Sequence, residues 1–385
     1  MRRGNLAIVI GLGAVGSAAL HYLAARGAKV LGLDRYAPPH DCGSSHGETR
    51  MTRVALGEGP EFIPLVRRSH ELWRELEAAT GRQLLHQIGG LIFGTSSHMA
   101  ETHGAPDFLG TTRAMARAHG IPHEMLDAPA IAERFPQFRL RGGEIGYFEP
   151  EAGYLAPEAC ILAHLEEARR LDANIRTGET VIRWESRGRT VRVVTDRATY
   201  EASRLILTAG PWLPHFLDIL PRRTAVFRQT TFWFEPDGPV EDFQADRLPV
   251  FVRLPDADSN MFYGFPVVDS STGGIKVASE QFERTCTPDS MERGVTDTEI
   301  AAMHRMVAPH LRITNRCLRA LACPYTVTPN FRFIIDHLPD AENIWFASAC
   351  SGHGFKHSPA IGEALADLAT TGRSNVGVSS FSLRR

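Results

Sequence analysis

The first 34 residues alternate apolar runs with a glycine-rich turn. Residues 6–11 (LAIVIG) are a continuous apolar run rich in Ile and Val, which predicts a strand buried on both faces of a parallel sheet. A helix follows and ends at Gly27, and residues 29–34 (KVLGLD) predict a second strand that ends at Asp34. Strand, turn, helix and strand in this order are typical of a parallel α/β sheet.

The turn after the first strand reads GLGAVG, in which Gly11, Gly13 and Gly16 have the spacing G-x-G-x-x-G. The first glycine permits a tight turn, the second lets the backbone approach a pyrophosphate, and the third lets the helix pack closely on the strand. The helix N-terminus offers N–H groups to phosphates, and Asp34 can accept hydrogen bonds from an adenosine ribose. The pattern therefore predicts a dinucleotide site. Its acidic residue disfavours NADP, but the spacing alone does not separate FAD from NAD.

A second loop, residues 38–53 (PPHDCGSSHGETRMTR), is rich in Pro, Gly, Ser and Thr. It brings His46, Thr49, Arg50 and Arg53 within eight positions. Guanidinium groups hold carboxylates bidentately, so this loop is a candidate site for an anionic group close to the dinucleotide. The alternative is a solvated surface loop.

Later segments predict further strands and a last helix. Apolar and aromatic positions predict strands within residues 200–212, 228–236, 261–267 and 273–280. Lys276 in the last of these is either a surface lysine that snorkels to solvent or a functional lysine. Residues 343–370 predict strand, glycine loop and helix, with Ser358 as the N-cap and Pro359 at the first helical position.

The loop before this helix contains Lys356 and two histidines. His353 and His357 have the i,i+4 spacing of a zinc-binding pair on a helix. Gly354 between them disfavours helix at this point. We therefore interpret them as neighbouring loop histidines and predict no metal site.

Composition narrows the class of protein. The 385 residues carry a formal net charge of -2, which gives no reason to expect nucleic acid or an anionic membrane as a partner. No apolar stretch is long enough to span a bilayer, and three glycines and His21 interrupt the apolar N-terminal run, so we expect no secretory signal. The six cysteines are scattered without a CxxC pair, which favours a reducing cytoplasm over a disulfide framework or a zinc site.

One of these cysteines, Cys323, lies in residues 321–336 (LACPYTVTPNFRFIID) directly before a proline. A buried cysteine usually behaves as a small hydrophobe, whereas a reactive one needs an accessible, electropositive setting. The residues alone leave both interpretations open. Pro324 favours extended backbone at Cys323, and Tyr325 is expected on the other face of the strand, toward a pocket.

Together these segments resemble the flavin-dependent amine oxidases of the monomeric sarcosine oxidase and N-methyltryptophan oxidase family, within the D-amino-acid-oxidase-like group. The resemblance runs from the N-terminal fingerprint to the last helix. Its most specific segments are PPH…GSSHGETRMTR…GEGPEFIPL, YGFP…IK, CPYT…FIID and SGHGFK.

The resemblance implies an α/β fold of mixed α+β type with two domains. A Rossmann-like FAD-binding domain would comprise residues 1–84, 151–219 and 311–385. A substrate-binding domain, built on a mixed and largely antiparallel sheet, would comprise residues 85–150 and 220–310. The active site would lie between them, in a protein that the resemblance implies to be a monomer.

The resemblance also implies a role for individual residues. The implied FAD contacts are Gly11, Gly13, Gly16, Asp34, Ser44, Val181, Gly352, Gly354 and Lys356, with a thioether from Cys323 to the flavin. The implied substrate contacts are Arg53, Lys356, Tyr263, Tyr325 and Glu280, of which Arg53 and Lys356 would hold the substrate carboxylate. The implied catalytic residues are Lys276, which would promote reaction with oxygen, and Arg50, His46 and Thr49 beside the flavin.

The implied activity is oxidation of a secondary amine, most simply an N-methyl amino acid, with O2 as acceptor, giving aldehyde, amino acid and hydrogen peroxide. Alternatives on the same scaffold are a cyclic imino acid or an Amadori-type amino acid as substrate, or an acceptor other than O2. The chain departs from the family pattern at three places: Ser45-His46 replaces a frequent pair of histidines, Glu280 replaces a histidine, and His357 replaces an aromatic residue. We expect Glu280 and His357 to change the charge near the pocket, so sarcosine itself does not follow as the substrate.

Overall fold

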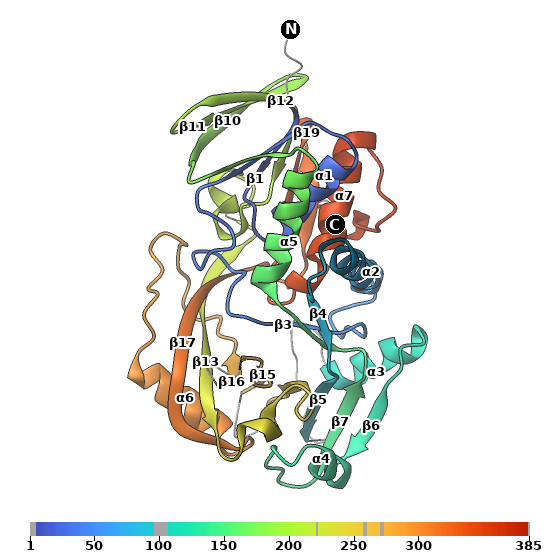
Figure 1. Cartoon of the computed structure of the whole chain (residues 1–385), viewed down its shortest axis with the longest axis vertical. Coiled ribbons are helices and arrows are strands. Elements are labelled where there is room, and N and C mark those ends of the chain that lie inside the picture. Colours follow the sequence, from blue (N-terminus) through green and yellow to red (C-terminus); the bar gives the residue numbers. More distant parts are fainter. Residues whose placement is uncertain (1–4, 96–106, 221, 257–259, 270–272, 384–385) are drawn as a thin grey trace.

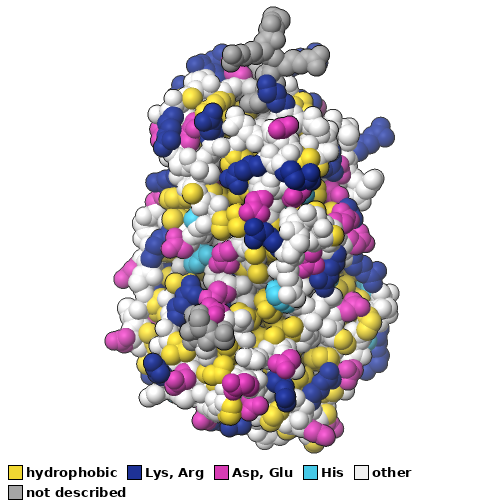
Figure 2. Space-filling model, viewed as in Figure 1, with side chains coloured by type: hydrophobic (Ala, Val, Ile, Leu, Met, Phe, Trp, Pro, Cys, Tyr) yellow, Lys and Arg dark blue, Asp and Glu magenta, His cyan; other side chains and the backbone are white. Residues whose placement is uncertain are grey.

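Two eight-stranded sheets occupy opposite ends of the long axis of the molecule, with helices packed beside the first sheet (Figure 1). The computed structural model describes residues 5–95, 107–220, 222–256, 260–269 and 273–383. None of the helices in these ranges is both long and apolar enough to cross a membrane. On the face shown in Figure 2, basic and acidic side chains are interspersed from one end of the molecule to the other, so this face carries no extended field of one sign.

The first sheet contains the N-terminal strand and has the order β10-β11-β12-β1-β2-β9, with β19 beside β12 and β18 beside β19. β9, β2, β1, β12 and β19 run parallel to one another, whereas β10, β11 and β18 pair antiparallel with their neighbours. The strands are β1 (Asn5–Ile10), β2 (Val30–Asp34), β9 (Asn174–Thr177), β10 (Val181–Arg187), β11 (Thr190–Thr195), β12 (Thr199–Leu207), β18 (Ile334–Leu338) and β19 (Ala341–Ser348). Buried apolar side chains line both faces of the central strands, as a parallel sheet requires.

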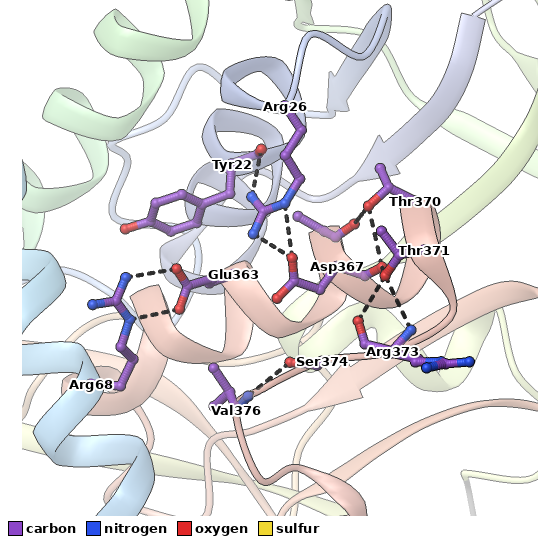
Figure 3. A network of polar contacts seen from close by, with 11 residues as sticks. Tyr22, Arg26, Arg68, Glu363, Asp367, Thr370, Thr371, Arg373, Ser374 and Val376 are labelled. Carbon is purple, nitrogen blue, oxygen red and sulfur yellow. Dashed lines mark hydrogen bonds and ion pairs between the residues drawn. The ribbon is translucent and has the colours of Figure 1, made fainter.

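Four helices gather beside this sheet: α1 (Ala14–Ala25), α2 (Phe62–Thr80), α5 (Pro157–Arg170) and α7 (Ser358–Thr371). α1 and α7 pack closely because α7 presents a glycine: a Cβ on Gly362 would lie 2.6 Å from the Cβ of Ala18. Two ion pairs hold α7 at its exposed side, Arg26–Asp367 at 2.6 Å and Arg68–Glu363 at 2.8 Å (Figure 3). Such surface pairs contribute little energy each, so the apolar packing holds the helices.

The second sheet has the order β17-β13-β16-β15-β14-β5-β7-β6 and is antiparallel except where β14 pairs with β5. Its strands are β5 (Gly90–Thr95), β6 (Glu124–Asp127), β7 (Glu144–Glu149), β13 (Ala225–Pro236), β14 (Val250–Arg253), β15 (Phe262–Phe265), β16 (Ile275–Ser279) and β17 (Ile313–Val327). α3 (Phe108–Ala118), α4 (Ala128–Arg134) and α6 (Asp297–Val307) accompany it. A Phe-rich cluster forms its core.

A small third sheet lies between the two large ones, formed by β3 (Arg50–Thr52), β8 (Gly153–Leu155) and β4 (Leu85–Gln87). Four short 3-10 helices complete the described structure: η1 (Gly210–His215), η2 (Val240–Phe243), η3 (Phe355–His357) and η4 (Ser379–Phe381). β3 is part of the Pro- and Gly-rich loop of residues 38–53. Backbone pairing of β3 with β8 holds this loop in place, between the two large sheets.

The predicted fold class, a parallel nucleotide-binding sheet with a second mixed sheet, is confirmed. Two details differ. The last helix has His357 as its N-cap, not Ser358, because η3 leads directly into the helix and moves its start one residue earlier. The predicted boundary at residue 311 places β17 with the FAD-binding part, but β17 pairs along β13 in the second sheet. We therefore propose the two-domain division with β17 moved to the substrate-binding side.

Candidate active site

A cavity of about 480 Å³ is lined by both large sheets. From the first sheet it receives residues at or just after the carboxyl ends of β1, β2, β12 and β19: Ile10, Asp34, Thr208 and Ser348. From the second sheet it receives residues of β13, β16 and β17: Gln229, Thr231, Lys276 and Cys323. Parallel α/β sheets bind ligands at the carboxyl ends of their strands, so this is the expected place for a functional site.

The structure brings most of the residues implicated by the sequence into this one cavity. Those in its lining are Gly11, Gly13, Asp34, Ser44, Thr49, Arg50, Arg53, Val181, Tyr263, Lys276, Glu280, Cys323, Tyr325, Gly352, Gly354 and Lys356. Gly16 and His46 are not in the lining.

The glycine turn after β1 has the geometry that a dinucleotide needs. Gly11 has φ +85°, and a Cβ there would lie 2.6 Å from the Cα of Ala209. A Cβ on Gly16 would lie 1.8 Å from the carbonyl oxygen of Gly11, so Gly16 acts by letting α1 pack against the turn. A Cβ on Gly13 would meet no described atom within 4 Å, which leaves the backbone open to a ligand.

The N-terminus of α1 and Asp34 complete this end of the cavity. No side chain caps the first turn of α1, whose N-cap is Gly13, so its N–H groups can bind an anion. Asp34 accepts hydrogen bonds from the backbone N–H groups of Leu12 at 2.7 Å and Tyr36 at 2.8 Å. These bonds fix the carboxylate at the carboxyl end of β2, where a ribose hydroxyl would bind.

Lys276 and the loop of residues 44–50 are in direct contact at the cavity lining. The Nζ atom of Lys276 donates to the carbonyl oxygens of Gly47 at 2.5 Å and Thr49 at 3.0 Å, and to Oγ1 of Thr49 at 3.0 Å. Glu158 fixes the same loop, since its carboxylate accepts from the N–H of Gly47 at 2.6 Å. Lys276 is only 3% exposed, which excludes the interpretation as a snorkelling surface lysine. Burial, and then the charge of Arg50, lowers the pKa of Lys276 well below its usual value.

Arg50 and His46 show that the second loop is structured. Arg50 donates to the carbonyl oxygens of Ser44 at 2.7 Å and Thr49 at 2.8 Å. His46 was expected beside the flavin, but it is buried outside the cavity lining. Burial, and then the charge of Arg50, lowers its pKa to about 4. His46 is therefore neutral, and its Nε2 atom is buried without a hydrogen-bond partner among the described residues. Sequence spacing did not show that its side chain lies outside the cavity lining.

Arg53 and Lys356 also line the cavity, and the carboxylate of Glu58 interacts with the charges of both. Arg53 donates to Glu58 at 2.8 Å and to the carbonyl oxygen of Ala55 at 2.7 Å. Lys356 donates to the carbonyl oxygen of His353 at 2.8 Å. Burial lowers the pKa of Lys356 to about 7, although the charge of Glu58 acts in the opposite direction. Glu58 also lines the cavity. The sequence reasoning missed it, although it lies inside the quoted segment GEGPEFIPL.

Cys323 and Tyr325 lie two residues apart on β17 and both line the cavity. The expectation that they would point to opposite faces was wrong, because side chains two positions apart on a strand share a face. Burial raises the pKa of Cys323, whereas the charges of Arg50 and Lys276 lower it. The hydroxyl of Tyr325 donates to the carboxylate of Glu280 at 2.6 Å. Cys323 is thus a buried thiol in an electropositive cavity.

The model of the FAD dependent oxidoreductase family (DAO) matches residues 7–368. The chain belongs to this family. Monomeric sarcosine oxidase of Streptomyces avermitilis is 39% identical over 387 residues, covering 98% of this chain and 97% of the relative. N-methyl-L-tryptophan oxidase of Yersinia pestis is 35% identical over 381 residues, covering 98% of each chain. The solved structure of NikD, an unusual amino acid oxidase essential for nikkomycin biosynthesis, shares the fold with a TM-score of 0.85 at 24% identity, covering 98% of this chain and 97% of that one.

The cavity of this FAD-dependent oxidoreductase fits a large polar cofactor. Oγ of Ser44 and Oγ1 of Thr326 are buried and have no hydrogen-bond partner within the described part of the chain, and both residues line the cavity. Buried polar atoms are almost always hydrogen-bonded in native proteins. We therefore expect these two hydroxyls to form hydrogen bonds with polar atoms of a ligand. The sequence reasoning missed Thr326, which directly follows Tyr325. It also missed Cys350, which lines the cavity beside the SGHGFK loop.

His357 does not change the charge of the site as expected. It lies outside the lining, its side chain is 0% exposed, and burial lowers its pKa well below the usual value. Its ring packs against Phe62 and Phe333 with centroids 5.7 and 5.5 Å away, so it takes the place of an aromatic residue in the core. Within the described ranges, no three His, Cys, Asp or Glu side chains are placed to hold a metal ion. Of Glu280 and His357, the two residues expected to change the charge near the pocket, only Glu280 lines the cavity.

Proposed function

We propose that this FAD-dependent oxidoreductase oxidises the secondary amine of an N-methyl amino acid with O2 to an imine and hydrogen peroxide, and that water then hydrolyses the imine to the aldehyde and the amino acid. The observation that carries the proposal is the position of Arg53 and Lys356: both line the cavity that also contains the dinucleotide turn and Lys276. The charge of Arg53 also acts on Lys356, and two neighbouring cations suit a carboxylate. The names of the relatives, a sarcosine oxidase and an N-methyl-L-tryptophan oxidase, support the same substrate class.

The residues that would hold FAD follow from the cavity. The turn at Gly11 and Gly13 and the N-terminus of α1 would hold the pyrophosphate, and Asp34 would hold the ribose. Ser44, Val181, Gly352, Gly354 and Thr326 would contact the rest of the cofactor, with Cys323 as its covalent attachment. When bound, FAD accepts a hydride equivalent from the substrate and passes the electrons to oxygen.

The protein side of the reaction is positioning. Arg53 carries five N–H donors, so it can hold a substrate carboxylate as well as Glu58, and Lys356 adds a second charge. Fixing the carboxylate fixes the carbon beside the amine, and such orientation lowers the activation barrier by replacing an encounter with a bound geometry. The amine must be neutral when it reacts, since an ammonium has no lone pair. Arg50 and Thr49 hold the loop around Lys276, whose charge would favour electron transfer to oxygen.

We propose that the chain acts as a monomer, as the name of one relative, monomeric sarcosine oxidase, suggests. The scattered, unpaired cysteines support the proposal of a reducing cytoplasm as its compartment.

The function is tested by incubating the purified holoenzyme in air with a panel of N-methyl amino acids, cyclic imino acids and Amadori-type amino acids and measuring hydrogen peroxide. We expect peroxide with one or more N-methyl amino acids. Peroxide only with cyclic imino acids or Amadori compounds would replace the substrate class. Reduction of the flavin in the absence of air without peroxide in its presence would indicate an acceptor other than O2.

Binding of a simple carboxylate should weaken as pH rises through about 7, because the pKa of Lys356 is lowered to about 7. Below this pH Lys356 is an ammonium and attracts the anion, and above it the free enzyme must take up a proton to bind. The dissociation constant should rise up to about tenfold per pH unit. Calorimetry with propionate from about pH 6 to about pH 9 would measure this.

The Lys356→Met variant should bind propionate more weakly at low pH and lose the pH dependence. The Lys29→Met variant is the matched control, because Lys29 is exposed and remote from the lining. It should keep the wild-type slope. An equal affinity of the wild-type protein on both sides of pH 7 would show that Lys356 does not hold the carboxylate.

A further inference from the structure

Glu280 directly follows β16, the strand that carries Lys276, and its side chain belongs to the cavity lining. It accepts the hydroxyl hydrogen of Tyr325 at 2.6 Å. Burial, and then the charge of Glu280, raises the pKa of Tyr325. The phenol therefore stays protonated and donates a hydrogen bond to the carboxylate. Tyr263, whose pKa is also raised by burial and then by Glu280, lies in the same part of the lining. Glu280 is thus a carboxylate set among aromatic rings in the substrate cavity.

The other carboxylates of the lining have evident tasks. Asp34 is fixed by two backbone N–H groups at the dinucleotide turn. Glu58 pairs with Arg53 at 2.8 Å. Glu179 accepts from the hydroxyl of Thr195 at 2.6 Å. None of these tasks explains an anion at residue 280, in a cavity whose substrate already brings a carboxylate of its own.

The reacting amine is a poor partner for this anion. A carboxylate beside an ammonium favours the protonated form, whereas oxidation next to nitrogen requires the neutral amine. A cation that takes no part in the reaction has no such conflict. Val252, Met261 and Phe265 also line the cavity and offer apolar surface to a methylene chain that would carry such a cation.

We propose that Glu280 selects an N-substituted amino acid whose side chain ends in a cationic group, of the lysine or ornithine type. This rests on the proposed function for the position of the substrate carboxylate at Arg53 and Lys356. The carboxylate of Glu280 and the rings of Tyr263 and Tyr325 receive the distal cation, through a charge-assisted hydrogen bond and cation–π contact. The apolar lining receives the methylene stem.

The test compares two ligands of nearly equal shape, lysine and norleucine, in both enantiomers, by calorimetry on the holoenzyme. We expect the wild-type protein to bind lysine about ten- to one-hundredfold more tightly than norleucine, the range for a hydrogen bond to a charged group. The Glu280→Gln variant should bind the two within about threefold of each other. Glu280→Asp, which keeps the charge, should retain part of the preference. Glu283→Gln, at an exposed position three residues after Glu280, is the matched control and should retain all of it.

Equal affinity of the wild-type protein for the two ligands, or an unchanged preference in Glu280→Gln, would overturn the assignment of Glu280. Peroxide formation from the panel of N-methyl amino acids, with N-methylnorleucine and N-methyllysine included, is measured in parallel. Turnover without a preference for lysine would leave the proposed function standing and remove Glu280 as the selecting residue. A preference for lysine without turnover of any N-methyl amino acid would do the reverse.

Discussion

The Lys276→Met variant should react with oxygen about 100- to 1,000-fold more slowly than the wild-type enzyme, the usual effect of removing one preorganised group that stabilises developing charge. Oxygen acquires a negative charge with its first electron, and a fixed cation in a buried site stabilises that charge far more than it would in water. Methionine keeps the length and the apolar stem of lysine while removing the charge. The rate at which substrate reduces the bound flavin should stay within about threefold of wild type, because Lys276 is not part of the proposed carboxylate anchor.

The structure gives a reason to expect a charged lysine at this position in spite of its burial. Burial and Arg50 lower the pKa of Lys276, but its Nζ atom reaches three acceptors at 2.5 to 3.0 Å. An ammonium has three N–H donors for them and a neutral amine has two. The rings of Trp233 and Phe265, whose centroids lie 5.4 and 4.9 Å from Nζ, also favour the cation. The sequence contains only three lysines among its 42 basic residues, and two of them line this cavity.

The measurement separates the two halves of the reaction. Enzyme reduced by substrate without air is mixed with oxygenated buffer, and the return of flavin absorbance gives the reoxidation rate. Lys29→Met is again the matched control and should behave as wild type. Reoxidation of Lys276→Met at the wild-type rate would remove Lys276 from the oxygen reaction, and the cation would then have to be sought at Arg50.

Local spacing was enough to predict the glycine turn after β1 and the place of Asp34 beside it. The roles of Gly11, Gly16 and Asp34 depend on residues close in sequence, on a strand, a turn and a helix that must meet in one way. The structure places each of them accordingly, with the clash distances at Gly11 and Gly16 explaining why a side chain is not tolerated. The prediction that Cys323 and Lys276 lie in one cavity came from the family resemblance. The two residues are 47 positions apart in the sequence, and no local pattern predicts a contact over that separation.

The sequence could not show which way a loop side chain points or which distant strands pair. A loop histidine such as His46 can lie inside or outside a cavity lining with the same spacing, and here it lies outside. The pairing of β17 with β13 joins residues about 90 positions apart, a register that no local pattern specifies. The ion pair of Arg53 with Glu58 could not be predicted either. The sequence indicates that an arginine can bind a carboxylate, but not whether that carboxylate belongs to a ligand or to the protein.

The flavin should remain bound to the protein after acid precipitation, and the Cys323→Ala variant should release all of its yellow colour. Cys323 lines the cavity as a thiol, and the thiolate is the nucleophilic form of cysteine. Burial raises its pKa, but Arg50 and Lys276 act in the opposite direction. Attachment would replace one hydrogen of the flavin 8α carbon by the sulfur, and the two electrons released would reduce the flavin, which O2 would then reoxidise. It should therefore be faster at about pH 9 than at about pH 7. The measurement is the absorbance at flavin wavelengths in the pellet and in the supernatant after precipitation.

Cys350 supplies the decisive control, because it is a second thiol in the same lining. Burial raises its pKa as well, and backbone hydrogen bonds with Gly352 and Thr326 oppose this effect. At Cys323 the causes that oppose burial are positive charges, first Arg50 and then Lys276. Charge therefore favours the thiolate of Cys323, the residue that the family resemblance implies as the attachment point. Cys350→Ala should thus keep its colour in the pellet, whereas colour lost from Cys350→Ala and kept in Cys323→Ala would assign the attachment to the other thiol. Colour released from the wild-type protein would show that neither thiol is linked and that Cys323 packs the cavity as a small apolar side chain.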